Sequence, residues 1–250
     1  PSFDVSLIEM LVAFSVGATL VIVPPTVFGG PELGELLRRQ RITHLFVTPS
    51  VLESLDPDHP NELRTIVCAG ERLGPEPVAR WTRPGRRVHN GYGPTETTIF
   101  AVCSDGLKPG EQVHIGTAVP AMGTYVLDSY LRPVPEGVIG ELYLTGPALA
   151  LGYLARPAAT AERFVANPFE TTSGRMYRTG DLVRRTSTGT LEYHGRVDFQ
   201  VKIRGLRIEL DEIDNILTTH PDIDYAATVG AMLPSGAQAL VSYVLPRVTT

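Results

Sequence analysis

The sequence has few of the residues that mark disulfide-rich, metal-binding, nucleic-acid-binding or membrane proteins. It holds two cysteines among 250 residues, Cys68 and Cys103, and both lie in apolar runs, which indicates reduced core residues and no disulfide framework. The six histidines show no metal-ligand spacing. The net charge of -5 is spread without long runs, so there is no pattern typical of binding to nucleic acid or a membrane surface. We therefore predict a globular, cytoplasmic protein.

One apolar stretch, residues 7–23, approaches the length of a membrane span. It contains Glu9 and Gly17 and ends at a Pro-Pro pair, so a helix followed by a buried strand at residues 18–23 fits it better. The sequence has no signal-peptide pattern, no internal repeat and no low-complexity segment. The abrupt start predicts a piece of a longer protein.

Residues 1–112 alternate between helical and strand-like patterns. This rhythm predicts a mainly parallel sheet covered by helices. The expected helices are 5–14, 32–40, 51–55 and 76–81, and the expected strands are 18–23, 42–48, 65–69 and 87–89. Ligands of such sheets bind at the carboxyl ends of the strands, where residues 69–71 and 90–92 fall.

From residue 113 the pattern changes to short β-rich runs separated by Pro, Gly and Ser. The expected strands are 124–128, 140–145, 177–178, 182–184 and 190–194, with a helix at 158–164, and they predict a barrel-like subdomain at 113–197. A third unit is expected at 198–250. It begins with a hairpin at 200–210, continues with a helix at 212–218 capped by Asp211, and ends with strands at 225–232 and 239–245.

The stretch 90–98, N-G-Y-G-P-T-E-T-T, carries the chemistry that stands out most. Its glycines and proline form a tight turn that presents a ring, Tyr92, a hydroxyl, Thr95, and a carboxylate, Glu96. A ring suits a purine, a hydroxyl suits a phosphate oxygen, and a carboxylate beside a phosphate suits Mg²⁺. The residues favour a nucleotide and metal site, but an ordinary Gly/Pro turn capped by Thr95 remains an alternative.

Residues 92–96 resemble the Y-G-P-T-E motif of the adenylate-forming superfamily, in the version found in nonribosomal peptide synthetase adenylation domains. Four further blocks match in the same order: F-D-x-S at 3–6, G-E-L to G-Y-L at 140–154, Y-R-T-G-D-L at 177–182 and G-R-x-D-x-Q-V-K-I-R-G at 195–205. The resemblance implies an α/β adenylate-forming fold. Such a fold has a mainly parallel βαβ sheet, a distorted β-barrel subdomain and the start of a small mobile α+β C-terminal subdomain.

The resemblance implies that an amino acid reacts with ATP to give an aminoacyl-AMP and pyrophosphate. It assigns nucleotide-binding roles to Gly70, Asn90, Gly91, Tyr92, Thr95, Asp181, Tyr193 and Arg196, with Thr95, Glu96 and Arg196 catalytic. Tyr92 would stack on adenine, Asp181 would accept the ribose hydroxyls, and Glu96 would hold Mg²⁺. The alternatives are a plain turn aspartate at Asp181 and a buried sheet tyrosine at Tyr193.

Asp4 is the residue on which the substrate class depends. The resemblance implies that Asp4 pairs with the α-ammonium group of an amino acid, whereas a helix N-cap is the alternative. The family's substrate pocket falls on Asp4, Val5, Ile8, Phe46, Val67, Ala69, Gly91, Ile99 and Phe100. Apart from Asp4 none is charged, so we predict a neutral, largely apolar amino acid, because a buried ionic side chain would need a partner. Ordinary core residues would give the same pattern.

The resemblance also implies partners. Asp198 would be the hinge of the mobile subdomain, and Gly205 would line the approach of a phosphopantetheine thiol carried by a carrier protein. Residues 156–164, R-P-A-A-T-A-E-R-F, are similar to a segment that contacts an MbtH-like activator protein, so Ala158 to Phe164 is a candidate docking site. A surface helix with an alanine face is the alternative. The resemblance places the protein in antibiotic-type biosynthesis, with no nucleic-acid or membrane partner.

Two parts of the family pattern are absent from these residues. They are the Ser/Thr/Gly-rich phosphate loop before F-D-x-S and the catalytic lysine near the end of the C-terminal subdomain; Lys202 belongs to the Q-V-K-I-R-G block. An excerpt of a longer enzyme, or an enzyme interrupted by a methyltransferase insertion, would explain both. The functions left open are an acyl- or aryl-acid ligase using coenzyme A, and a catalytically silent fragment that binds nucleotide or a partner protein.

Overall fold

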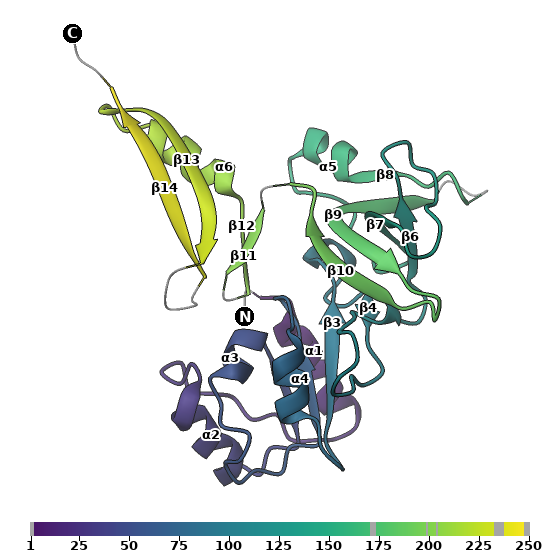
Figure 1. Cartoon of the computed structure of the whole chain (residues 1–250), viewed down its shortest axis with the longest axis vertical. Coiled ribbons are helices and arrows are strands. Elements are labelled where there is room, and N and C mark those ends of the chain that lie inside the picture. Colours follow the sequence, from purple (N-terminus) through teal and green to yellow (C-terminus); the bar gives the residue numbers. More distant parts are fainter. Residues whose placement is uncertain (1–2, 171–173, 199, 204, 233–237, 248–250) are drawn as a thin grey trace. The chain divides into compact units, whose positions relative to one another are not determined.

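The computed structural model describes residues 3–170, 174–198, 200–203, 205–232 and 238–247 (Figure 1). The chain divides into two compact units, Pro1–Gly195 and Arg196–Thr250. Within the described ranges, no helix is both long enough and apolar enough to cross a membrane.

Unit 1 contains the predicted parallel sheet. Its five strands lie in chain order: β1 (His44–Val47), β2 (Thr65–Cys68), β3 (Arg87–Tyr92), β4 (Val102–Cys103) and β5 (Thr117–Ala118). The first three strands are parallel, and β4 and β5 continue the sheet in antiparallel fashion. The sheet thus passes residue 112, where the first subdomain was expected to end.

The helices around this sheet are α1 (Val5–Ser15), α2 (Gly30–Arg39), α3 (Pro49–Glu53) and α4 (Pro75–Trp81) (Figure 1). The apolar faces of α2, α3 and α4 form one core with β2 and β3. Its members include Leu33, Leu37, Leu52, Ile66, Val78, Trp81 and Val88. Proline in the first turn of each of these three helices pre-sets the backbone for helix entry. Helix α1 has no buried residue.

The strand predicted at residues 18–23 is wrong. These residues form neither helix nor strand, and Ile22 is 82% exposed. A β-strand needs a hydrogen-bonding neighbour and a covered face, and no described strand pairs with this run. The apolar pattern alone could not supply that information.

The second sheet of unit 1 has the order β10-β9-β7-β6, with β8 paired to β9. Its strands are β6 (Gly123–Leu127), β7 (Ile139–Thr145), β8 (Phe164–Ala166), β9 (Arg175–Arg185) and β10 (Leu191–Arg196), and α5 (Pro157–Arg163) precedes β8. The pairs β6–β7, β7–β9 and β8–β9 are antiparallel. This sheet matches the predicted β-rich region, including its interrupting helix.

One strand replaces the two that were predicted at 177–178 and 182–184. Strand β9 runs through the expected T-G-D turn because the irregularity there is a β-bulge: the register with β7 shifts between Glu141 and Tyr143. Gly180 takes up the bulge with a φ of 76°, a left-handed conformation that glycine adopts at little cost.

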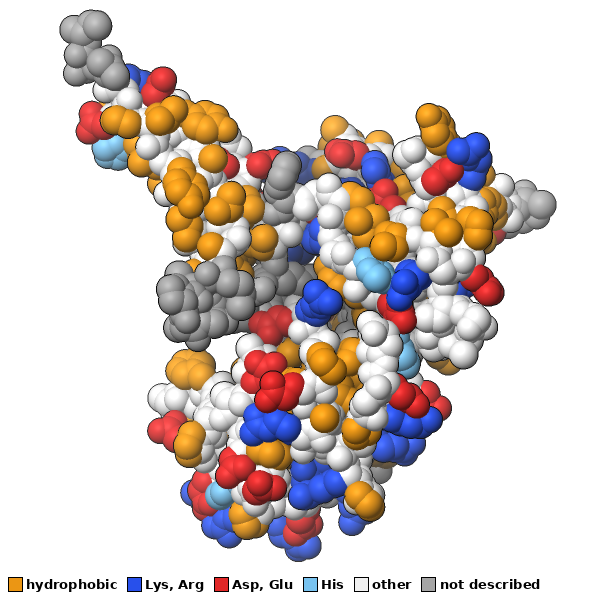
Figure 2. All heavy atoms as spheres, viewed as in Figure 1, with side chains coloured by type: hydrophobic (Ala, Val, Ile, Leu, Met, Phe, Trp, Pro, Cys, Tyr) orange, Lys and Arg blue, Asp and Glu red, His pale blue; other side chains and the backbone are white. Residues whose placement is uncertain are grey.

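Unit 2 contains two hairpins and a helix. The elements are β11 (Val201–Ile203), β12 (Leu206–Ile208), α6 (Leu210–Thr218), β13 (Ile223–Met232) and β14 (Gln238–Pro246), and both strand pairs are antiparallel. Figure 2 shows hydrophobic side chains gathered over β13 and β14, where Tyr225, Val229 and Tyr243 are exposed. The prediction that Asp211 caps α6 is wrong. The helix begins two residues earlier, at Leu210 after Glu209, so Asp211 lies in its first turn, where a carboxylate still complements the helix dipole.

Candidate functional site

The carboxyl ends of β2 and β3 bring several predicted residues side by side. Cys68 pairs with Asn90, so Ala69 and Gly70 leave β2 beside the start of the 90–92 segment. Asn90 is buried. Its side-chain amide donates to the His114 carbonyl at 3.2 Å, and its backbone N–H donates to Ser104 Oγ at 2.7 Å. Both Asn90 and Gly70 are thus held at the sheet edge where ligands of parallel sheets bind.

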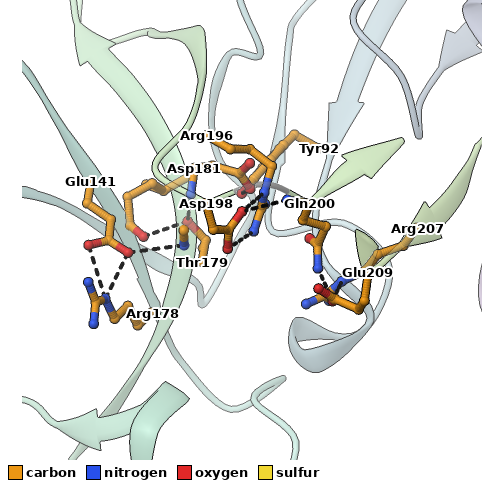
Figure 3. Close-up of polar contacts among 12 residues, drawn as sticks. Tyr92, Glu141, Arg178, Thr179, Asp181, Arg196, Asp198, Gln200, Arg207 and Glu209 are labelled. Carbon is orange, nitrogen blue, oxygen red and sulfur yellow. Dashed lines mark hydrogen bonds and ion pairs between the residues drawn. The ribbon is translucent and has the colours of Figure 1, made fainter. Parts of the chain in front are cut away.

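Tyr92 and Asp181 form a buried pair, although 89 positions separate them in the sequence. The Tyr92 hydroxyl donates to Asp181 Oδ2 at 2.5 Å, and the two residues are 7% and 3% exposed (Figure 3). Burial and the Asp181 carboxylate raise the pKa of Tyr92 well above its usual value. The hydroxyl therefore stays protonated and continues to donate to Asp181.

The β-bulge of β9 orients Asp181. Thr179 Oγ1 donates to the Leu142 carbonyl at 2.8 Å and accepts from the Asp181 backbone N–H at 2.9 Å. Glu141 accepts from the Gly180 backbone N–H at 3.2 Å and from Arg178 Nε at 2.9 Å (Figure 3). Because both sides of the bulge are bonded to β7, the Asp181 carboxylate is fixed in position before any ligand binds.

Glu96 lies in the short 3₁₀ helix Thr95–Thr97 and is 7% exposed, while Thr95 is exposed. The Tyr153 hydroxyl donates to Glu96 Oε1 at 2.6 Å, and the Ala150 backbone N–H donates to the Glu96 carbonyl at 2.8 Å. These bonds tie Glu96 to the loop that follows β7. Thr95 does not cap this helix. Pro94 occupies the N-cap position, and no side chain forms a capping hydrogen bond.

The side chains near Glu96 that could act as metal ligands determine which kind of Mg²⁺ site is possible there. Among the described residues, no group of three or more His, Cys, Asp or Glu side chains could hold a metal ion. Mg²⁺ in nucleotide sites is usually held by one or two carboxylates, with phosphates and water completing its shell. A single anchored carboxylate such as Glu96 fits that arrangement, and a metal bound by protein alone does not.

The loop from Gly93 to Phe100 is strained and tightly packed. Thr98 and Ile99 have φ values of 58° and 72°, which is rare for β-branched residues and costs about 1–3 kcal/mol each. A Cβ at Gly93 would lie 2.2 Å from the Ile99 carbonyl oxygen, and a Cβ at Gly91 would lie 2.8 Å from the Phe100 ring. Close approach of the backbone therefore requires glycine at position 93, whereas a side chain at position 91 would displace the Phe100 ring. Strained backbone of this kind is common at ligand sites.

The predicted substrate pocket is partly assembled. Phe46 of β1 pairs with Val67 of β2, and the Phe100 ring lies against Gly91. Asp4 stands at the N-cap position of α1, but its side chain makes no capping hydrogen bond, so the N-cap alternative does not account for this carboxylate. Val5 and Ile8 lie in the first turns of α1. Their roles in substrate binding stay predictions.

The remaining predicted residues divide between the two units. Tyr193 packs against the core formed by Tyr92, Val126 and Leu142 in unit 1, so it has a structural role whatever else it does. In unit 2, Arg196 binds Asp198 in a bidentate pair at 2.6 and 2.9 Å (Figure 3). Gly205 has a φ of 75° in the turn between β11 and β12, as a tight hairpin requires.

Three residues that support the site were not singled out from the sequence: Tyr153, Thr179 and Glu141. Each lies inside a motif quoted above, so the signal was present. The contacts themselves could not be predicted, because Tyr153 meets Glu96 across 57 positions and Thr179 acts through the backbone of a bulge.

The fold is that of the adenylate-forming family. Residues 1–154 match the model of the family described as "AMP-binding enzyme". The chain is 44% identical to novobiocin biosynthesis protein H of Streptomyces niveus and 48% identical to CymA of Salinispora arenicola, described as a probable non-canonical nonribosomal peptide synthetase, each over 98% of the chain. Its structure matches that of PA1221, described as a nonribosomal peptide synthetase protein containing adenylation and PCP domains, with a TM-score of 0.88, 28% identity and 98% of the chain covered.

The chain belongs to the AMP-binding enzyme family, and its resemblance to the adenylation domains of nonribosomal peptide synthetases is confirmed. It spans 41% of the novobiocin protein, 3% of CymA and 51% of PA1221.

Proposed function

We propose that this chain belongs to an enzyme that activates a neutral, apolar amino acid with ATP. The products are the aminoacyl-AMP and pyrophosphate, and the aminoacyl group then passes to the phosphopantetheine thiol of a carrier protein. The observation that carries the proposal is the buried Tyr92–Asp181 pair, fixed beside Asn90 at the carboxyl end of β3 in a member of the AMP-binding family. Its adenylate-forming fold supports the same interpretation.

Each residue at this edge has a task that its chemistry suits. The Asp181 carboxylate accepts from Tyr92 and would also accept both ribose hydroxyls, since a carboxylate has about four acceptor positions. Tyr92 would offer its ring to adenine while its hydroxyl stays on Asp181. Thr95 would donate to the α-phosphate. Glu96 would hold Mg²⁺, which supplies charge neutralisation for the phosphates. The protein's contribution is mainly alignment of two anions and exclusion of water.

The substrate class rests on Asp4 and on the neutral pocket. Asp4 would pair with the α-ammonium group, and its carboxylate is not used for capping α1. Phe46, Val67 and Phe100 would surround a side chain without charge. A branched aliphatic amino acid is one example of such a substrate.

Transfer to the carrier would use unit 2. Arg196 and Asp198 form a bidentate pair at the start of this unit, so a rotation at the proposed hinge, Asp198, would change the position of the Arg196 cation. Gly205 would leave room for the thiol arm. PA1221, which contains a PCP domain, gives the comparison that supports a carrier partner.

A small MbtH-like activator protein would dock at α5, at Ala158 to Phe164. Thr160 of this helix accepts from the Tyr153 backbone N–H at 2.9 Å, and the Tyr153 hydroxyl donates to Glu96. A protein that orders α5 would therefore also order the donor to the proposed Mg²⁺ ligand. The measurement that checks this is the activity of the intact enzyme purified with and without the activator.

The experiment that tests the proposal is amino-acid-dependent ATP–pyrophosphate exchange by the intact polypeptide, across a panel of amino acids. We expect exchange with one or a few neutral apolar amino acids, a loss of at least about 100-fold in Asp4→Ala, and no loss in the exposed control Asp58→Ala. Exchange that depends on a carboxylic acid without an amino group would support the coenzyme A ligase instead. No exchange with any acid, in the presence of the activator, would support the silent fragment.

A further inference from the structure

A second candidate site lies at the amino ends of the three parallel strands, at the opposite end of β3 from Tyr92. A pocket of about 520 Å³ lies there, lined by His44, Arg64, Thr65, Arg83, Gly85, Arg86 and Arg87. Four of the lining residues are arginines, and none is acidic. Nothing in the proposed adenylation reaction uses these residues.

Arg83, Arg86 and Arg87 lie within five consecutive residues, and the fold brings Arg64 beside them. The register of the sheet aligns His44 of β1 with Thr65 of β2, and Thr65 with Arg87 of β3. Arg83 and Arg86 close a tight turn in which Pro84 and Gly85 hold the central positions, and Gly85 has a φ of 80°. Proline followed by a left-handed glycine is the sequence of a type II turn, so the placement of Arg83 and Arg86 is built into the backbone.

Arg86 is one of the residues that line the pocket, and it is 2% exposed. Its Nε donates to the Leu63 carbonyl at 3.0 Å, a second nitrogen donates to Asn61 Oδ1, and the guanidinium lies 5.2 Å from the centre of the Trp81 ring. Its Nη1 has no hydrogen-bond partner in the described part of the chain. Burial and repulsion from Arg83 lower the pKa of Arg86 to about 10. A buried cation held without a carboxylate is costly unless an anion joins it.

The other arginines of the pocket also lack an anionic partner. Among the described residues, no side chain forms a hydrogen bond or ion pair with the guanidinium of Arg64, Arg83 or Arg87. Arg64 acts on the Glu62 carboxylate through space, but Glu62 is already bound by Arg41 at 2.7 Å. The pocket therefore carries a positive charge that no carboxylate among the described residues neutralises by direct contact.

We propose that this pocket binds a small anion that carries two or more phosphate groups. Guanidinium groups bind phosphate oxygens in bidentate geometry, and a cluster of four needs more than one negative charge to balance it. The volume lies within the range of small-molecule sites, about 300–1,000 Å³. A flat basic patch would suit a long acidic segment, whereas a pocket with a buried arginine suits a compact polyanion.

The site is separate from the nucleotide loop. Arg87 and Tyr92 lie at the two ends of β3, about 17 Å apart at the usual rise per residue of a strand. The inference therefore does not depend on the proposed adenylation, and the two can fail separately.

The test is calorimetric titration of the intact polypeptide with inorganic pyrophosphate, with AMP and Mg²⁺ present at saturating concentration to occupy the nucleotide site. The test variant is Arg83→Gln combined with Arg87→Gln, since both side chains are exposed and neither is bonded to another side chain in the described ranges. The matched control is Arg39→Gln combined with Arg80→Gln, which removes the same charge from exposed positions outside the pocket. A second test variant, Arg64→Gln, still tests the proposal if the first variant misfolds.

We expect the wild type and the control pair to bind pyrophosphate with similar Kd, and the Arg83/Arg87 pair to bind at least about 10-fold more weakly. Arg64→Gln should weaken binding in the same direction. Equal weakening in the control pair would overturn the proposal, because it would show a general charge effect. So would the absence of binding by the wild type, or displacement of pyrophosphate by a polyglutamate peptide of higher affinity, which would assign the pocket to an acidic protein segment.

Discussion

The two ends of the same parallel strands carry opposite chemistry. At the carboxyl end, the acidic residues Asp181 and Glu96 are buried, and each accepts a hydroxyl from a tyrosine. At the amino end, Arg86 is buried with no carboxylate beside it, and three more arginines line the same pocket. At the carboxyl end, hydrogen bonds from tyrosines hold the two carboxylates in place. At the amino end, the arginines have no carboxylate partner among the described residues.

This difference shows two ways in which a sheet edge can be prepared for a ligand. The carboxyl end is rigid, because a bulge, a strained loop and two closely packed glycines fix its polar groups. At the amino end, positive charge is concentrated at one tight turn. A bound anion would supply the charge neutralisation that this end lacks. The predictions that follow test this contrast, starting with the largest expected effect.

Asp181→Asn should reduce ATP–pyrophosphate exchange by at least about 100-fold, because it removes the charge that would accept two ribose hydroxyls. Tyr92→Phe is the matched comparison. It removes the hydroxyl that donates to Asp181 but keeps the ring, so we expect a loss of about 10-fold or less. Steady-state exchange rates at varied ATP would measure both. Equal losses in the two variants would contradict the separate roles of the carboxylate and the ring.

Gly93→Ala should destabilise the protein more than Gly85→Ala, which sits in the turn at the amino end. A Cβ at Gly93 would meet the Ile99 carbonyl oxygen at 2.2 Å, whereas a Cβ at Gly85 has no neighbour within 4 Å and faces only its φ of 80°. We expect losses of about 3 kcal/mol and about 1 kcal/mol in the free energy of unfolding. Denaturant titration would compare them. A larger loss at Gly85 would show that the amino-end turn is the more constrained of the two.

Gly91→Ala should change amino-acid selectivity more than nucleotide binding. The new methyl group would meet the Phe100 ring at 2.8 Å, so the ring must shift within the proposed substrate pocket. We expect KM for the amino acid to rise about 10-fold and KM for ATP to change less than about 3-fold. Rises of the same size in KM for ATP and for the amino acid would contradict a selective role of Gly91 and Phe100 in the substrate pocket.

His114 should make the carboxyl end sensitive to acid, and this effect is the smallest. Its carbonyl binds Asn90, and burial lowers the pKa of the His114 ring below its usual value. Below about pH 6.5 the unfolded chain therefore binds more protons than the folded chain at this position, so stability falls as the pH drops. His114→Gln should lessen the fall in Tm between about pH 7.5 and about pH 5.5, a window that spans the usual histidine pKa. An equal fall in Tm in the wild type and in His114→Gln would contradict this account.

Much of the fold could be predicted from local patterns. The parallel strands, the helices α1 to α6, and the first hairpin and the last two strands of unit 2 follow from apolar periodicity and from turn residues. The failures have physical reasons. The run 18–23 has the composition of a strand but no partner, and the T-G-D segment has the composition of a turn although Gly180 lets β9 continue as a bulge. In both segments, pairing with a distant strand determines whether a strand forms, and a local sequence pattern does not contain that information.

The sites differ in the same way. Motifs pointed to Tyr92, Glu96 and Asp181, but the bonds from Tyr92 to Asp181 and from Tyr153 to Glu96 depend on tertiary packing. The arginine pocket had no motif at all. Arg64, Arg83 and Arg87 belong to no motif, and the turn at 83–86 together with the pairing of β2 and β3 brings them to one pocket.

The most direct test of the contrast between the two ends is equilibrium binding of AMP and of pyrophosphate to the same intact polypeptide, in Asp181→Asn and in the Arg83→Gln/Arg87→Gln pair. We predict that Asp181→Asn loses affinity for AMP but binds pyrophosphate, in the presence of saturating AMP, as the wild type does. The arginine pair should bind AMP normally and lose affinity for pyrophosphate. If either variant weakened both ligands equally, the two ends would not be separate sites, and the account would be wrong.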